Sequence, residues 1–162
     1  MIRWLAVLVL GIAGAAQANC GAVIEALERA MQQERLAQDD IDSPDQPLTG
    51  RPMVVRINKM SWIDTGTGQY EKHPDSGANP IISALKRDAA KGAAKCEAIG
   101  AGNHRGQASD KYRLDGSVGS SLTGRVTLWI SKANGLPIYQ EFEKLGAGGI
   151  AWVYGSAVKE PR

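Results

Sequence analysis

The sequence has few of the residues that usually carry catalysis, metal binding or nucleic-acid binding. It contains two cysteines, two histidines and one phenylalanine, and aromatic residues make up only 6% of the chain. Its 19 basic and 17 acidic side chains are scattered, whereas a nucleic-acid partner requires Lys and Arg gathered on one face. We therefore exclude a nucleic-acid partner. No C-x-x-C spacing is present, so two separate sulfurs provide no zinc site, and we expect no metal.

Residues 1–18 have the pattern of a secretory signal peptide. Arg3 precedes an apolar run over 4–15, and Ala-Gln-Ala at 16–18 matches a cleavage site. The apolar run is shorter than the roughly 20 residues that a membrane-spanning helix needs. We predict a cleaved signal over 1–18, a single domain over 19–162 without a transmembrane segment, and a periplasmic location. Lipidation at Cys20 is the less favoured alternative, because Asn19 stands where a lipobox has a small residue.

The two cysteines, Cys20 and Cys96, both lie in the exported part of the chain. An oxidising compartment would pair them and close a loop of about 76 residues. In the chain-entropy model this loop closure stabilises the fold by up to roughly 4.5 kcal/mol. We predict one structural disulfide.

The first half of the mature chain predicts two helices around a long strand. Apolar residues at spacings of three and four indicate an amphipathic helix from Val23 to Leu36, and an acidic loop follows over 39–52. Alternation indicates one strand over 53–64, then a glycine-rich hairpin turn at 65–68 and a return over 69–72. A second helix is expected after Asn79 as N-cap, with Pro80 at the first helical position.

The second half predicts an antiparallel meander. Strands are expected at 96–99, 107–115, 125–131, 138–145 and 150–158, separated by glycine-rich turns. Within 125–131, Val126, Leu128 and Ile130 share one face, and Trp129 lies on the more polar face with Arg125. One side of the sheet is therefore expected to be the more apolar.

No fragment of the sequence meets the requirements of a catalytic or cofactor motif. The glycines at 100–106 do not match the dinucleotide-binding spacing, and 146–149 lacks the Lys-Ser/Thr of a phosphate loop, so we expect no cofactor. His73 and His104 both fall in predicted loops, where histidines are usually solvated. A third hypothesis is a hydrolase that uses His104 with Asp110. No nucleophile accompanies this pair, and we therefore assign no catalytic residue.

Two segments of the second half resemble a known family. CEAIG at 96–100 with RGQASDKYRL at 105–114, and LWISKANGLPI at 128–138, are similar to the hairpin and the Trp-Ile…Gly-Leu-Pro segment of LolA/LolB-like periplasmic lipoprotein carriers and their outer-membrane lipoprotein-sorting relatives. Trp152, Val153 and Tyr154 fit the aromatic strand that closes these proteins. The resemblance covers residues 95–161.

The resemblance implies an α+β fold in which a strongly curved antiparallel sheet, a half barrel, is covered by two helices and accepts acyl chains on its concave face. The expected function is that of a periplasmic carrier or sensor without enzymatic activity, which binds a lipid or another apolar small molecule. The candidate ligand-binding residues are Val55, Ile57, Leu114, Val126, Leu128, Ile130, Trp152 and Tyr154. The same side chains suit an ordinary filled core.

The alternative function is a structural or interaction module of the cell envelope with a filled core. Trp62 and Trp129 are placed by the alternation on strand faces that also carry polar residues. Exposed aromatic patches mark contact sites, so these two tryptophans are the candidate residues for binding another envelope protein.

Overall fold

The computed structural model describes residues 13–115, 125–143 and 148–161. Within these ranges the elements are α1 Ala13–Met31, β1 Arg35–Ile41, β2 Val54–Ile57, β3 Met60–Asp64, β4 Tyr70–Pro74, α2 Pro80–Ala90, β5 Lys95–His104, β6 Gln107–Asp115, β7 Val126–Ser131, β8 Pro137–Phe142, β9 Gly149–Tyr154 and a 3-10 helix, η1, Gly155–Ala157. The start of the predicted signal peptide, 1–12, and part of the glycine-rich segment, 144–147, lie outside the described residues.

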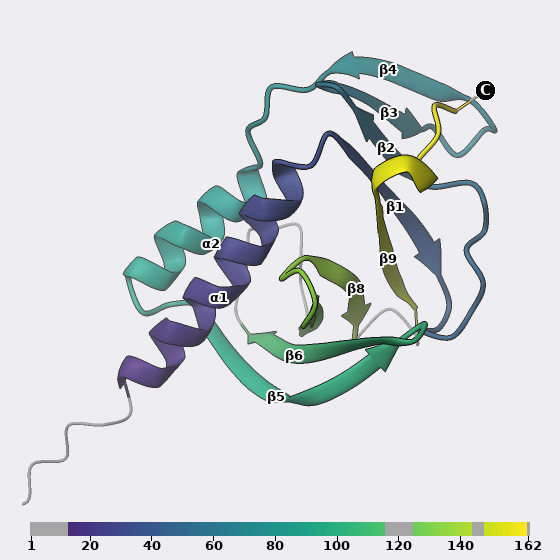
Figure 1. The fold of residues 1–162 in the computed structure, drawn as a ribbon. Helices are drawn as coiled ribbons and strands as arrows, with labels where there is room; N and C mark the ends of the chain where they lie inside the picture. The colour runs from purple at the N-terminus through teal and green to yellow at the C-terminus, as the bar shows by residue number, and fades with distance from the viewer. Residues whose placement is uncertain (1–12, 116–124, 144–147, 162) are drawn as a thin grey trace, which may run out of the picture.

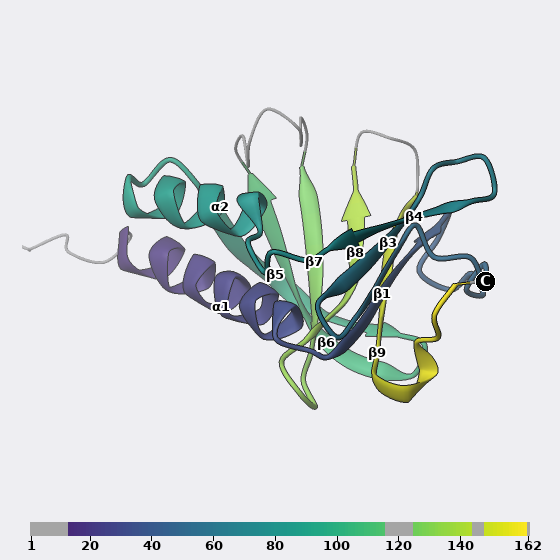
Figure 2. The ribbon, with the colours of Figure 1, turned by 90° about the horizontal axis from the view of Figure 1, so that it is seen from above.

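The nine described strands form one open sheet in the order β4-β3-β2-β1-β9-β8-β7-β6-β5, and every pair of neighbours is antiparallel. The sheet curves strongly around the side on which α1 and α2 lie (Figure 1). Figure 2 shows the two helices side by side along this concave side. The predicted α+β half barrel with two helices is therefore confirmed.

The second helix begins as its sequence predicts. The Asn79 side chain accepts hydrogen bonds from the backbone N–H groups of Ile81 and Ile82, which would otherwise lack partners at the first turn. Pro80 occupies the first turn, where its missing N–H costs nothing. Ile82 and Leu85 are buried on the face that α2 turns toward the sheet.

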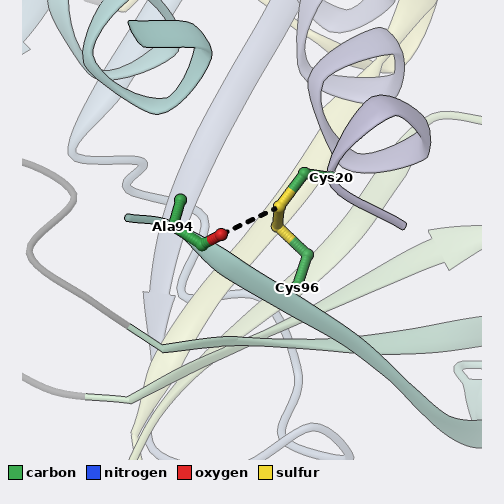
Figure 3. Close-up of a disulfide and its surroundings, with 3 residues drawn as sticks. All are labelled: Cys20, Ala94 and Cys96. Atoms are coloured by element: carbon green, nitrogen blue, oxygen red, sulfur yellow. Dashed lines mark hydrogen bonds between the residues drawn. A yellow bond between two sulfur atoms is a disulfide. The ribbon is translucent and has the colours of Figure 1, made fainter. Parts of the chain in front are cut away.

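A disulfide joins the first helix to the meander. Cys20 in α1 and Cys96 in β5 form the predicted bond, with their Cα atoms 5.0 Å apart and 76 positions separating them in the sequence. Both cysteines are buried, and the carbonyl oxygen of Ala94 lies 3.9 Å from the Cys20 sulfur (Figure 3). Lipidation of Cys20 would require the same sulfur atom, so the disulfide and lipidation of Cys20 exclude each other.

The core occupies both faces of the sheet, because side chains of a strand alternate. Leu36 of β1 packs with Ala30 of α1 and with Trp152 on the helix side. The next residue, Ala37, packs on the opposite side within a cluster that contains Val55, Ile57, Trp62 and Val158. The chain after β9 thus covers part of the face that the helices leave free (Figure 1).

Two expectations fail over 32–41: the helix does not continue to Leu36, and no loop begins at residue 39. The helix ends at Met31, and Leu36 and Asp39 belong to the central strand β1. Asp39 is buried at 3% exposure, and its carboxylate accepts hydrogen bonds from the backbone N–H and the hydroxyl of Thr49. A carboxylate satisfied in this way can lie inside a sheet, and the sequence pattern does not reveal its partner.

The expected long strand over 53–64 is wrong as well, because the segment is a hairpin of β2 and β3. Asn58 and Lys59 form its two-residue turn with φ values of 50° and 65°. Two residues with positive φ make the tight turn that suits strand twist. The reversal pairs Trp62 with Val55 and moves this tryptophan to the face opposite to the one expected.

The five strands predicted after residue 95 are present in the predicted order. Three of them differ in length: β5 continues to His104 with an irregularity between Ala98 and Gly100, β8 ends at Phe142 instead of 145, and β9 ends at Tyr154, where η1 replaces the rest of the strand expected up to 158. The glycine-rich segment 100–106 is therefore the end of a strand followed by a turn at Arg105 and Gly106. It forms no ligand-binding loop of the dinucleotide type.

Candidate functional site: an apolar cavity under the helices

A cavity of about 230 Å³ lies between the helices and the concave face of the sheet. Leu27 of α1 and Ile82 and Leu85 of α2 form its helical wall. The whole lining consists of Leu27, Gln38, Asn79, Ile81, Ile82, Leu85, Leu114, Val126, Leu128, Gln140, Phe142, Ile150 and Trp152. Ten of these thirteen side chains are apolar, and the cavity therefore suits an apolar ligand.

The cavity opens to solvent beside the start of α2. Ile81 lines it, yet 41% of this residue is exposed. An isoleucine that is half in solvent and half in a cavity marks the entrance, since a closed core buries such a side chain. Gln38 and Gln140 supply amide groups within the otherwise apolar wall, as is usual where a few polar groups orient a ligand.

The volume sets the size of what the cavity can hold. An apolar cavity of about 150 Å³ accommodates benzene, and small-molecule sites usually span about 300–1,000 Å³. A space of about 230 Å³ therefore takes part of one acyl chain or a small apolar group, and two chains would not fit side by side.

Four of the eight ligand-binding residues proposed from the sequence lie in this lining: Leu114, Val126, Leu128 and Trp152. Ile130 instead packs beneath α1 close to the disulfide, and Tyr154 packs beside Trp152. Burial raises the pKa of Tyr154, whose hydroxyl donates to the carbonyl oxygen of Pro137 at 2.7 Å. This tyrosine is thus a structural anchor for β9.

Placing Val55 and Ile57 in the cavity is wrong. Both belong to the cluster on the opposite face of the sheet, together with Trp62. Val55 and Ile57 do share a face, as their alternation predicts. The pairing with β1 decides on which side of the sheet that face lies. Ala37 pairs with Val55, and Ala37 points away from the helices.

The expected exposure of Trp62 and Trp129 is also wrong, since only 7% and 9% of these residues are exposed. A Cβ atom at Gly102 would lie 2.8 Å from the ring of Trp129, so the indole rests directly on the backbone of β5. Lysine side chains complete the cover: Lys111 Nζ and Lys72 Nζ each lie 4.9 Å from the ring centre of Trp129 and Trp62, respectively. Neither tryptophan presents an aromatic patch.

Sequence reasoning missed several members of the lining, both polar and apolar. Gln38 was missed because β1 was not recognised as a strand. Gln140, Phe142 and Ile150 lie on predicted strands, and their alternation places them on one face. The strongest local signal for this wall is the predicted helix after Asn79, since Ile81, Ile82 and Leu85 of that helix all line the cavity.

His104 is buried at 4% exposure, although a solvated loop histidine was expected. Its ring stacks on Tyr139 at 5.1 Å and meets Trp129 edge-on at 6.5 Å. Asp110 instead forms an ion pair with Lys132 at 3.0 Å. Among the described residues no ion pair joins His104 to Asp110, so the His-Asp pair of the hydrolase reading is not assembled.

Further searches of the described residues concern metals and membranes. In the ranges 13–115, 125–143 and 148–161, no three His, Cys, Asp or Glu residues are grouped so that they could hold a metal ion. In the same ranges no helix combines the length and the apolar character needed to cross a membrane.

No family model and no curated protein matches the chain. Solved structures are similar to it in fold. The lipoprotein LppX from Mycobacterium tuberculosis has 14% identity and a TM-score of 0.46, and the match covers 90% of this chain and 97% of that one. For LprF from Mycobacterium bovis the identity is 15% and the TM-score 0.43, with 92% and 97% covered.

A third similar structure has 10% identity and a TM-score of 0.31, and the match covers 91% of this chain and 94% of that one. It is a LolA superfamily protein from Nitrosomonas europaea. The likeness is one of fold.

Proposed function

We propose that this protein is an exported, non-enzymatic carrier or sensor that binds the apolar part of a small amphiphile between its helices and its curved sheet. The observation that carries the proposal is the largely apolar cavity with Ile81 at its entrance. The walls of a cavity that stays unfilled lose packing contacts, which a ligand restores. An accessible apolar space of this kind therefore favours a bound apolar group over a filled scaffold.

The pattern of residues 1–18 supports export to the periplasm, with the mature domain starting at Asn19. The Cys20–Cys96 bond also supports an oxidising compartment. The interaction module loses support as an alternative, because the tryptophans on which it rested are buried.

Native mass spectrometry of the gently purified mature protein, with displacement of a fluorescent fatty-acid probe, tests the proposal. We expect lipid-sized adducts that leave on activation, and probe binding that Ile81→Trp weakens by about tenfold or more, because the indole fills part of the entrance. Ile63→Trp is the matched control, since Ile63 is a similarly exposed isoleucine (45%) outside the cavity. If the spectrum shows only the mass of the ligand-free protein and the probe does not bind, the carrier function is refuted.

A further inference from the structure

A second hollow, of about 300 Å³, lies between the end of α1 and the start of α2. In contrast to the cavity it is mainly polar. Its lining consists of Glu28, Met31, Gln32, Gly77, Ala78, Asn79, Ile82, Ser83 and Lys86. We refer to this set of residues as the interhelical groove.

The interhelical groove adjoins the apolar cavity. Asn79 and Ile82 line both spaces, so one side chain of α2 and its N-cap form the partition. Ile82 is buried, whereas the next residue, Ser83, is exposed to the groove. A ligand that extends past Ile82 would therefore have its apolar end in the cavity and its polar end in the groove.

The groove contains one charge of each sign. Glu28 of α1 and Lys86 of α2 form an ion pair across it, and their side chains are 41% and 51% exposed. Among the residues that the structure describes, no other charged side chain lines it. An exposed pair of this kind contributes little to stability, so a ligand can separate the two groups at small cost. A ligand with only a negative charge would be attracted by Lys86 but repelled by the carboxylate of Glu28. A zwitterion can pair its negative group with Lys86 and its positive group with Glu28.

We propose that the interhelical groove binds the zwitterionic headgroup of a single-chain amphiphile, with its phosphate at Lys86, its ammonium at Glu28 and its chain passing Ile82 into the cavity. This inference rests on the proposed function and names its ligand class. The volume of the cavity limits the ligand to one acyl chain. The positive charge of Lys86 and the negative charge of Glu28 favour a headgroup that carries both charges.

The test is a competition measured by native mass spectrometry on the full mature chain with its disulfide intact. The probes are lysophosphatidylethanolamine, lysophosphatidylglycerol and the free fatty acid, all with the same acyl chain and supplied at equal concentration. We expect the zwitterion to be retained at least fivefold over either anion. Glu28→Gln should abolish this preference by strengthening the binding of the anions, and Lys86→Gln should weaken both phosphate-bearing lipids.

Glu25→Gln in α1 and Lys91→Gln at the C-cap of α2 are the matched controls, because they make the same charge changes outside the groove. Both should keep the wild-type preference. Equal retention of the three probes by the wild-type protein, or equal effects of Glu25→Gln and Glu28→Gln, would overturn the headgroup site while leaving the carrier intact. Retention of none of the probes would instead refute the proposed function itself.

Discussion

At the scale of single residues, His104 is a titratable side chain whose surroundings differ from the sequence expectation, because it is buried and not solvated. Burial lowers the pKa of His104 below 6.5, and the positive charge of Arg105 lowers it further. A backbone hydrogen bond with Pro44 and the charge of Asp45 oppose these effects without reversing them. Burial also raises the pKa of the stacked Tyr139 to about 12, so both rings are neutral at pH 7.

The lowered pKa of His104 predicts a stability that depends on pH. The unfolded chain binds a proton near pH 6.5 while the folded protein does not, so the free energy of unfolding should fall as the pH drops below about 6.5. Urea unfolding at pH 7.5 and pH 5.5 measures this change. His104→Gln should make the change smaller, and His73→Gln, at an exposed histidine, should not. Equal changes in all three proteins would contradict the assignment.

At the scale of elements, the turn between β2 and β3 determines which face of the sheet each strand residue occupies. Asn58 tolerates positive φ, but Lys59 at φ 65° has a side chain that disfavours it. Nothing in the alternation over 53–64 signals the reversal, because the residues on both sides of the turn continue a period of two.

We predict that Lys59→Gly raises the free energy of unfolding by roughly 0.5 kcal/mol. Removal of the left-handed strain gains roughly 1 kcal/mol, and the freer unfolded chain costs roughly half of it. Chemical denaturation of the two proteins provides the measurement. Lys91→Gly, at an ordinary φ of −90°, is the control and should be neutral or destabilising. A loss of stability for Lys59→Gly would show that the turn is not strained.

Helix α2 and the strands β5 to β9 could be predicted because their signals are local. The N-cap Asn79 and the alternation in β7 need only their immediate neighbours in sequence. The strand β1 could not be predicted, because its stability depends on pairing with β2 and β9 and on the contact between Asp39 and Thr49. Tertiary pairing overrides local propensity in such strands.

At the scale of the whole molecule, the disulfide ties α1, and with it the helical cover, to the start of the meander (Figure 3). We predict that Cys20→Ala with Cys96→Ala lowers the free energy of unfolding by roughly 2–4 kcal/mol, because the unfolded chain gains the freedom of a long loop. Denaturant unfolding of this double variant and of wild-type protein with and without reductant measures the loss. Reduced wild type should match the variant, and an unchanged midpoint would contradict the prediction.

The sequence by itself determined the order of the second-half strands, the capped helix, the disulfide partners and the half-barrel class. Only the tertiary structure decided which side chains line the cavity, that both tryptophans are buried and that a polar groove adjoins an apolar space. The physical reason is the difference between local and long-range information. Alternation tells which residues of a strand share a face, whereas pairing with a distant strand and coverage by helices decide which face meets the cavity.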